Sequence, residues 1–447
     1  MAECMCPIAL HAQLSPHEPA LITDDKTWTY RACHSLVEGL CRSLKTSGIE
    51  PGARVAFIAR KIPHSIFLFF ALFRLRAIAC PISFREPREK LPELMNRLDS
   101  SHFFETEELP LIPSEECTDS IFLERDVATC LLTSGSSGQP KVACHTIHNH
   151  FSNALGTIDF FALDPGSRWL LSLPLFHVGG LAILFRIFLT GGAVVLSDLS
   201  LLDALHKHPI THLSLVTTQL IRLLREEKKI PEQIRCLLLG GAPIPSLCFL
   251  EAKQRGIPLV TTYGMTEMSS IITAAKEPSS PHAGKALPHR ECTVSADREI
   301  LVRGDTLFSG YWDHHTKMLL PGRTDGWFAT KDIGEFTQDG DLCILGRKDR
   351  LFISGGENIH PEEIERALVS IPGIASATIV PIADPEFGMR PVAFIQDETA
   401  SHTLDSVREA LRAQLPSFKH PVRMFAYPSG ENLKISYSYL KEFLQKI

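Results

Sequence analysis

The stretch "LLTSGSSGQPK", residues 131–141, leads from an apolar strand into a loop of small polar residues. The loop comprises Thr133, Ser134, Gly135, Ser136, Ser137 and Gly138, with Lys141 at its far end. Small residues let backbone N–H groups point inward at anionic oxygens, and a lysine adds a mobile positive charge. The stretch therefore predicts a phosphate-binding loop, although a solvated turn has the same composition. It is not a Walker A loop, which would place the lysine directly after Gly138.

Strand and helix patterns alternate on both sides of this loop. Apolar strands are predicted at residues 53–59, 169–175, 191–197 and 211–216, and a helix to about residue 227 follows the last of them. The apolar run at 65–80 is interrupted by Arg74 and Arg76 and falls short of the roughly twenty residues of a membrane span, so it predicts a buried helix leading into a strand. This alternation predicts an α/β fold with a parallel-rich sheet, helices on its faces and ligands at the carboxyl ends of the strands.

The pattern changes to short strands and turns from about residue 290. Strands at 299–304, 310–312, 326–336 and 340–347 predict a small antiparallel, barrel-like subdomain over about 290–346. A small α+β unit follows the polar, glycine-containing segment 346–350. We therefore predict an N-terminal domain over residues 1–348 and a C-terminal domain over 349–447.

Composition excludes several classes of protein. The chain has 447 residues, 44% of them hydrophobic and 21% charged, which is typical of a soluble globular protein with more than one domain. A net charge of −6 argues against a nucleic-acid or membrane-surface partner. Twelve cysteines without a CxxC pair, behind an N-terminus that does not resemble a secretory leader, predict reduced thiols and a cytoplasmic location. The sequence leaves open whether the chain forms a homo-oligomer.

The motifs TSGSSGQPK, PLFH, LGGAP, TYGMTE, TKD and GGE occur in this order, and a lysine follows near the C-terminus. The series resembles that of the acyl-adenylate-forming superfamily, which includes acyl-CoA ligases, amino-acid adenylation domains and beetle luciferases. The resemblance covers nearly the whole chain. It implies that a small-molecule carboxylic acid reacts with ATP to give acyl-AMP and pyrophosphate, after which the thiol of coenzyme A attacks the acyl group. It also implies Mg²⁺ and a mobile C-terminal domain.

In such an enzyme the loop and Lys141 would contact the β- and γ-phosphates. The motif LGGAP would let the adenine base approach closely through Gly240, Gly241 and Ala242. The motif TKD supplies Asp332, which the resemblance places at the ribose hydroxyls with help from Arg347. These residues would hold the nucleotide on three sides.

The motif TYGMTE would lie below the nucleotide. The resemblance implies that Tyr263, beside Gly264, stacks on adenine and that Thr266 holds a phosphate oxygen. Glu267 would ligate Mg²⁺, a cation that prefers oxygen ligands. A carboxylate at a helix N-terminus is the plain structural alternative for Glu267.

Two further motifs concern the acid and the second half-reaction. His177 in LPLFHVGG resembles the histidine at the acyl pocket, although a lone histidine after an apolar run also suits a protein core. The resemblance assigns the adenylation lysine to Lys434 and the hinge between the domains to Asp349. The coenzyme A side would include Gly355, Gly356 and Glu357. Leu433 and Tyr437 depart from the family pattern, which commonly has glycine and arginine there.

Within the superfamily, the stretches "WLLSLPLFHVGG", "ADPEFGMRPVA" and "LKISYSYLKEFL" are most similar to the o-succinylbenzoate–CoA ligases of menaquinone biosynthesis. Their substrate carries a second carboxylate on the ring, so a cationic or hydroxyl partner is expected in the pocket. Candidates for that partner are Arg222, Arg186, Thr218, Ser269 and Ser270. Arg222 also fits a solvated helix face.

Three alternatives stay open. Another aryl- or acyl-CoA ligase would share the motifs and differ only in its pocket. An amino-acid adenylation enzyme would need an aspartate for the substrate ammonium, and no good candidate is present. A non-catalytic nucleotide-binding relative would have lost charged site residues, but Lys141, Glu267, Asp332 and Lys434 are all retained.

Overall fold

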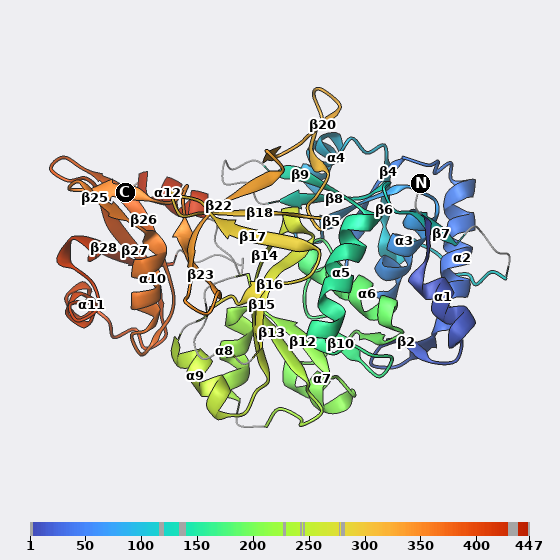
Figure 1. Cartoon of the computed structure of the whole chain (residues 1–447), viewed down its shortest axis with the longest axis horizontal. Helices are drawn as coiled ribbons and strands as arrows, with labels where there is room; N and C mark the ends of the chain where they lie inside the picture. Colours follow the sequence, from blue (N-terminus) through green and yellow to red (C-terminus); the bar gives the residue numbers. More distant parts are fainter. Residues whose placement is uncertain are drawn as a thin grey trace.

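The structure is a computed structural model of the whole chain. It describes residues 3–115, 120–133, 140–226, 229–241, 244, 246–276, 278, 282–427 and 437–445. The C-terminal elements form a lobe at one end of the molecule, at the left of Figure 1, and the N-terminal helices lie at the other end. No helix in these described ranges is long and apolar enough to cross a membrane.

The largest sheet has nine strands, and its central strands run parallel. In spatial order they are β16 (Lys285–Ala286), β15 (Ser270–Lys276), β14 (Leu259–Met265), β13 (Cys236–Leu239), β12 (His212–Leu215), β10 (Arg168–Leu170), β11 (Ala193–Val195), β2 (Pro19–Ile22) and β3 (Thr27–Thr29). Because β10, β12, β13 and β14 are parallel, the segments that follow them emerge at one edge of the sheet. That edge is where ligands collect in open α/β sheets.

The second sheet has seven strands. They are β20 (Met318–Leu320), β19 (Gly310–Asp313), β9 (Lys141–Thr146), β8 (Val127–Thr133), β5 (Ile78–Ser83), β4 (Arg54–Ala59) and β6 (His102–Glu105). The predicted phosphate loop connects β8 to β9, and Thr133 lies opposite Lys141 across this antiparallel pair. A separate short pair joins β1 (Glu3–Met5) to β7 (Ile121–Leu123).

Helices fill the space between the two large sheets, and others cover their outer faces (Figure 1). The inner helices are α3 (Pro63–Arg74), α5 (Ile147–Phe161) and α6 (Val178–Thr190). The outer ones are α7 (Leu201–Lys207), α8 (Thr217–Arg225), α9 (Ser246–Gln254) and α4 (Leu91–Leu98), while α1 (Pro7–Leu14) and α2 (Tyr30–Thr46) close the N-terminal end. Helix α3 is buried along Ser65–Arg74, which confirms the buried helix predicted at this position.

A third, antiparallel sheet follows. It contains β17 (Arg290–Val294), β18 (Glu299–Gly304), β22 (Trp327–Phe336), β21 (Arg323–Thr324) and β23 (Leu342–Arg347). The strand predicted at 310–312 does not belong to this sheet. It is β19, which pairs with β9 of the seven-stranded sheet. The strand predicted at 169–175 also ends earlier, at Leu170, because the chain turns there toward α6.

The C-terminal lobe has its own sheet and its own apolar clusters. Its strands are β25 (Glu357–Ile359), β24 (Phe352–Ser354), β27 (Gly388–Asp397), β26 (Ile374–Asp384) and β28 (Arg423–Ala426). Its helices are α10 (Pro361–Val369), α11 (Leu404–Leu411) and α12 (Tyr437–Gln445). The predicted α/β class with a smaller α+β unit is confirmed, whereas the domain boundary at 348/349 stays a prediction.

The inner helices are joined by an aromatic cluster centred on Phe185 of α6. Its ring stacks on His150 at 4.8 Å between centroids and lies 5.8 Å from Phe73 of α3 and 5.7 Å from Phe151 of α5. Phe185 has no exposed surface. A single side chain therefore contacts all three helices between the two sheets.

We expect Phe185→Ala to lower the free energy of unfolding by about 3–5 kcal/mol, because it leaves a cavity at this junction. Denaturant unfolding followed by tryptophan fluorescence measures the change, since all four tryptophans precede residue 348. Phe336→Ala is the matched control, because Phe336 is 41% exposed and should change stability by no more than about 0.5 kcal/mol. Equal effects of the two substitutions would contradict the prediction.

Candidate functional site

The carboxyl edge of the nine-stranded sheet is shaped by two glycines after β13. A Cβ atom on Gly240 would lie 2.5 Å from Thr262 Oγ1, so this position has no room for a side chain. Gly241 adopts a φ of +80°, a conformation that glycine accepts without strain. The backbone of the LGGAP motif is therefore bare at this edge, as the predicted adenine contact requires. Ala242 lies outside the described residues.

Strand β14 brings Tyr263 to the same edge, where its hydroxyl donates to Asp332 Oδ2 at 2.6 Å. Asp332 lies on β22 of the third sheet and also accepts from Arg347 Nη1 at 3.2 Å. Burial raises the pKa of the Asp332 carboxyl, while the hydrogen bond from Tyr263 and the charge of Arg347 act in the opposite direction. Burial, followed by the charge of Asp332, raises the pKa of Tyr263. Two residues predicted at adenine and ribose are thus in direct contact.

Close packing fixes the turn that follows β14. A Cβ atom on Gly264 would lie 2.1 Å from the Ser270 carbonyl oxygen. His145 Nε2 contacts the Thr266 carbonyl oxygen at 2.7 Å, so Nε2 carries the proton and donates. Burial lowers the pKa of His145 to about 4, and the ring is therefore neutral at neutral pH. His145 was not predicted, and it holds the backbone of the motif that carries the predicted phosphate contact of Thr266.

Glu267 is buried in this turn, and its carboxylate accepts a hydrogen bond from Tyr311 at 2.5 Å on Oε1. Burial raises the pKa of Tyr311, and the neighbouring negative charge of Glu267 raises it further, so the phenol keeps its proton. The Lys141 ammonium lies 4.7 Å from the centre of the Tyr311 ring. Tyr311 was also missed from the sequence, where its only signal is the GYW stretch.

The structure describes the two ends of the predicted phosphate loop, Thr133 and Lys141. The Thr133 hydroxyl donates to the Lys141 carbonyl oxygen at 3.4 Å, which closes the base of the loop. The predicted phosphate contacts Ser134, Gly135, Ser136, Ser137 and Gly138 lie outside the described residues. Lys141 at the end of the loop is exposed, with Glu267 on the other side of Tyr311. One side chain, that of Tyr311, therefore lies in contact with both the end of the loop and the predicted metal carboxylate.

The residues present could hold Mg²⁺ in the way that nucleotide-binding enzymes do, with few ligands from the protein. The described residues contain no group of three or more histidine, cysteine or acidic side chains that could enclose a metal. Glu267 offers one buried carboxylate, with one oxygen bonded to Tyr311. Mg²⁺ commonly takes one or two carboxylates and completes its octahedron with phosphate oxygens and water. A single glutamate beside a phosphate loop meets that need.

Arg186 of α6 is 1% exposed and lies next to the same turn. Its Nη2 donates to Asn153 Oδ1 at 3.2 Å and to Ser270 Oγ at 3.3 Å, whereas Nε is buried without a hydrogen-bond partner. Burial lowers the pKa of Arg186 to about 9, so the guanidinium remains charged at neutral pH. Asn153 is a further residue that sequence analysis missed.

The other residues predicted to contact the acid lie in two separate places. Ser269 is buried and donates to the Thr306 carbonyl oxygen at 2.9 Å. Ser269 and Ser270 have φ values of 55° and 129°, a conformation that costs a non-glycine residue about 1–3 kcal/mol and that concentrates at functional sites. Arg222 and Thr218 lie exposed on α8. The structure therefore brings Arg186 and the two serines together and leaves the α8 pair on the surface.

His177 is the residue before α6 and is exposed, with its ring 4.6 Å from that of Phe176. It does not lie in the apolar core, where a lone histidine after an apolar run could have been placed. Arg186 occupies the same helix further along. Two of the residues predicted near the acid therefore belong to one segment, His177 just before α6 and Arg186 buried in its body.

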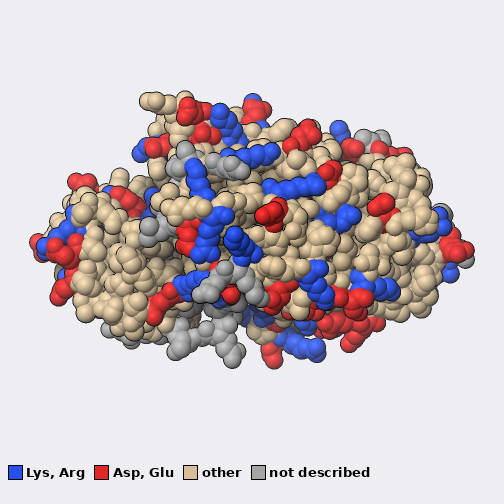
Figure 2. Space-filling model, turned by 90° about the horizontal axis from the view of Figure 1, so that it is seen from below, with Lys and Arg blue, Asp and Glu red and all other residues tan. Residues whose placement is uncertain are grey.

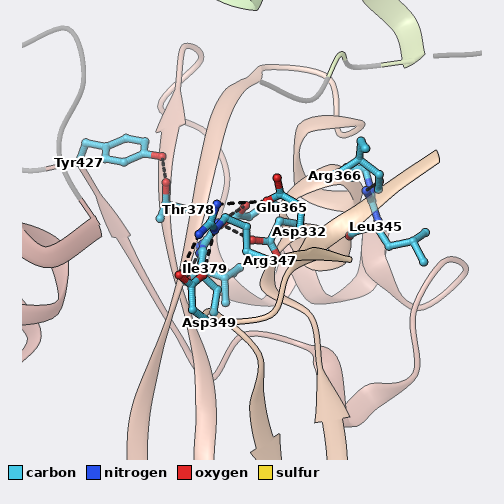
Figure 3. Close-up of polar contacts among 12 residues, drawn as sticks. Asp332, Leu345, Arg347, Asp349, Glu365, Arg366, Thr378, Ile379 and Tyr427 are labelled. Atoms are coloured by element: carbon cyan, nitrogen blue, oxygen red, sulfur yellow. Dashed lines mark hydrogen bonds and ion pairs between the residues drawn. The ribbon is translucent and has the colours of Figure 1, made fainter. Parts of the chain in front are cut away.

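The segment between the third sheet and the C-terminal lobe carries a charge network (Figure 3). Arg347 donates through Nε and Nη2 to the two carboxylate oxygens of Asp349, each at 2.9 Å, and through Nη1 to Asp332. The hydrogen bond to Asp349 is the main cause that raises the pKa of Arg347. The predicted hinge residue is therefore bonded to an arginine that also contacts the predicted ribose carboxylate.

The coenzyme A candidates lie in the turn between β24 and β25. Gly355 and Gly356 have φ values of 58° and 86°, and Glu357 is exposed at the start of β25. Tyr437, at the start of α12, lies with its ring 4.8 Å from the Arg350 guanidinium. The departure from the family pattern at Tyr437 thus supplies an aromatic partner to a cation. Lys434 and Leu433 lie outside the described residues.

Lysine and arginine side chains gather in the middle of the face seen in Figure 2, between the C-terminal lobe and the rest of the molecule. Positive charge focused on one region raises the local concentration of anionic ligands. The site as a whole is suited to a ligand with several negative charges.

Known proteins match the chain along its length. The model of the AMP-binding enzyme family matches residues 8–122 and 113–312, and that of the AMP-binding enzyme C-terminal domain matches 363–429. The 2-succinylbenzoate–CoA ligase of Salmonella typhimurium is 34% identical over 445 residues, which cover 97% of this chain and 96% of the relative.

Solved structures agree. A variant of Escherichia coli MenE with bound OSB-AMS has a TM-score of 0.88 at 32% identity, with 100% of both chains covered. Bacillus subtilis o-succinylbenzoate coenzyme A synthetase (MenE) with ATP and magnesium ion has a TM-score of 0.86 at 28% identity, covering 95% of this chain and 96% of that one. The resemblance predicted from the motifs is thereby confirmed. The chain belongs to the AMP-binding enzyme family, and its relatives within that family include 2-succinylbenzoate–CoA ligases.

Proposed function

We propose that this chain is an AMP-forming ligase that converts 2-succinylbenzoate (o-succinylbenzoate) to its coenzyme A thioester, a step of menaquinone biosynthesis. ATP and coenzyme A are co-substrates and Mg²⁺ is the cofactor. The identity to 2-succinylbenzoate–CoA ligases over almost the full length supports the reaction. The cytoplasm is the location we propose, since ATP and coenzyme A are available there.

The observation that carries the choice of acid is the buried charge of Arg186, which has no carboxylate partner. Its guanidinium lies 5.7 Å from the ring centres of Phe161 and Trp169, and neither ring supplies a negative charge. No carboxylate among the described residues forms an ion pair with it, and its Nε has no partner. An arginine this deeply buried is costly unless a counter-charge reaches it. A substrate with a second carboxylate, on the ring, supplies that counter-charge.

Arg290 shows what a purely structural buried arginine looks like in the same fold. It is 5% exposed, and its guanidinium donates to the carbonyl oxygens of Pro288, Ile271 and Asn153. All of its nitrogens are used by the backbone. Arg186, by contrast, retains an Nε–H without a partner, which supports a ligand role for Arg186 and a packing role for Arg290.

The first half-reaction is a displacement at the α-phosphorus of ATP. A carboxylate oxygen of the acid forms a bond to that phosphorus, and the bond to the pyrophosphate oxygen breaks. Lys141 and the loop before it would bind the leaving pyrophosphate, and Asp332 would hold the ribose so that the α-phosphate faces the acid. Mg²⁺, held by Glu267 with phosphate oxygens and water, would supply neutralisation of the charge that develops on pyrophosphate.

The second half-reaction is acyl transfer. The thiol of coenzyme A releases its proton to solvent as its sulfur forms a bond to the acyl carbon, and AMP leaves with the electron pair of the broken carbon–oxygen bond. His177 at the start of α6 would border the path of the thiol. The turn at Gly355, Gly356 and Glu357 would face the site in this state, after rotation of the C-terminal domain.

The rotation we propose is confined to Asp349 by anchors on either side of it. Lys348 Nζ donates to Glu299 at 2.8 Å and to Asp297 at 2.5 Å, both in the N-terminal part. Arg350 Nη1 donates to Glu362 of α10 at 2.8 Å, and Arg350 Nη2 donates to Glu365. The residue before the hinge is thus tied to one domain and the residue after it to the other.

We expect Arg186→Gln to lower kcat/KM for 2-succinylbenzoate about 30-fold or more, because a charge-assisted contact to the ring carboxylate is lost. The informative comparison substrate is 4-oxo-4-phenylbutanoate, which is the same acid without the ring carboxylate. For this monoacid kcat/KM should change less than about threefold. Pyrophosphate release with ATP, Mg²⁺ and coenzyme A measures both.

Arg222→Gln makes the same chemical change on the exposed face of α8 and serves as the comparison variant. A selective loss with the diacid in Arg222→Gln, and none in Arg186→Gln, would place the second carboxylate at α8. Equal losses with both acids in Arg186→Gln would show that Arg186 serves packing only. A wild-type preference for benzoate, coumarate or octanoate would keep the adenylation chemistry and overturn the choice of acid.

We expect Lys434→Ala to reduce acid-dependent pyrophosphate release about 100-fold or more, because it removes the cation proposed for the carboxylate and the α-phosphate. Thioester formation from supplied acyl-AMP should stay within about threefold of wild type. Lys441→Ala, an exposed lysine on α12, is the control and should affect neither half-reaction. Equal losses of both half-reactions in Lys434→Ala would refute this division of labour.

A further inference from the structure

Tyr311 of β19 stands between two side chains of opposite charge. Its hydroxyl donates to Glu267 Oε1, and its ring faces the Lys141 ammonium at 4.7 Å. Both charged residues lie in the described part of the chain, and no ion pair joins them. One neutral side chain therefore contacts both the carboxylate proposed for the metal and the lysine proposed for the phosphates.

Neighbouring strands fix the place of Tyr311. It lies opposite Ala143 of β9, two residues beyond Lys141 at the start of the same strand. The ring of Phe308 packs edge-on against Tyr311 at 4.8 Å, and the Phe308 amide donates to the Glu267 carbonyl oxygen at 2.8 Å. The tyrosine and the two charges are thus attached to one framework of backbone hydrogen bonds.

The chemistry of the phenol suits this place better than a second charge would. Without the tyrosine between them, the carboxylate of Glu267 and the ammonium of Lys141 would attract each other. A direct ion pair would leave neither charge available to a ligand. The hydroxyl satisfies one carboxylate oxygen and leaves the other available, while the π-face attracts the ammonium without neutralising it. Each charge therefore remains available to a ligand.

We propose that Tyr311 is a positioning residue for Mg²⁺-bound ATP, which keeps Glu267 and Lys141 apart and aims one carboxylate oxygen of Glu267 at the metal. This inference rests on the proposed function, in which Glu267 holds Mg²⁺ and Lys141 binds phosphate. Tyr311 does not touch the reacting atoms. It acts through the two residues it contacts.

The test is calorimetric titration of ATP, with and without Mg²⁺ and with no acid present, into the full-length Tyr311→Phe variant. Phenylalanine keeps the ring under Lys141 and removes only the hydroxyl. We expect the affinity for ATP with Mg²⁺ to fall about tenfold, the usual effect of removing a residue that orients a metal ligand. The affinities for ATP without Mg²⁺ and for AMP should change less than about twofold, because they do not involve the Glu267–metal contact.

Two further variants separate positioning from packing. Tyr30→Phe removes a buried hydroxyl that donates to the Gly192 carbonyl oxygen at 2.7 Å, far along the chain from the site, and should leave all three affinities unchanged. In a Glu267→Gln background, Tyr311→Phe should add no further loss for ATP with Mg²⁺, because the two residues act as one unit.

The outcomes distinguish this inference from the proposed function. If Glu267→Gln binds ATP with Mg²⁺ as tightly as wild type, Glu267 does not hold the metal and the proposed site fails. If Glu267→Gln loses the Mg²⁺ effect but Tyr311→Phe retains it, only the role of Tyr311 is overturned. An equal loss for ATP with and without Mg²⁺ in Tyr311→Phe would likewise reduce Tyr311 to a packing residue.

Discussion

The turn between β14 and β15 is held by hydrogen bonds from three other parts of the fold, and the geometry of the site depends on it. The contacts are Tyr263 with Asp332, His145 with Thr266, Tyr311 with Glu267, and Arg186 with Ser270. They come from the third sheet, the seven-stranded sheet and α6. Together they stabilise a backbone with two successive positive φ values, which no single hydrogen bond of about 1 kcal/mol would hold.

Local patterns in the sequence were enough to predict the elements but not all of their neighbours. Alternating apolar segments predicted the α/β class, and an all-apolar run predicted the buried α3. The strand at 310–312 was also predicted, yet in the wrong sheet. Its partner β9 lies more than a hundred residues earlier, and nothing in a run of three residues identifies a partner that distant. Which distant strands pair with each other is determined by the folded chain as a whole.

The residues of the candidate site likewise fall into those that the sequence indicated and those that it did not. Roles for motif residues such as Asp332 and Glu267 could be proposed from the sequence because they lie in short, ordered motifs. Their supports, Tyr311 and Asn153, could not, because each acts through a contact far along the chain. The sequence analysis left open whether Arg186 of α6 or Arg222 of α8 binds the second carboxylate, although the sequence contained a signal that favours one of them. An arginine inside "LAILFRIFL", a helix apolar on all sides, could have been recognised as buried, and burial is what separates Arg186 from the exposed arginine of α8.

Arg347 links Asp332, the carboxylate proposed for the ribose, to Asp349, the proposed hinge, through a single guanidinium. One edge of it bonds both oxygens of Asp349, and the remaining nitrogen contacts Asp332 (Figure 3). Ribose hydroxyls that donate to Asp332 would do so at a carboxylate already shared with Arg347. Because a guanidinium has a fixed planar geometry, its position cannot be adjusted for one carboxylate without changing its contact with the other. In the proposed mechanism, the occupancy of the nucleotide site and the orientation of the C-terminal domain would therefore be coupled by one side chain rather than by a long path through the core.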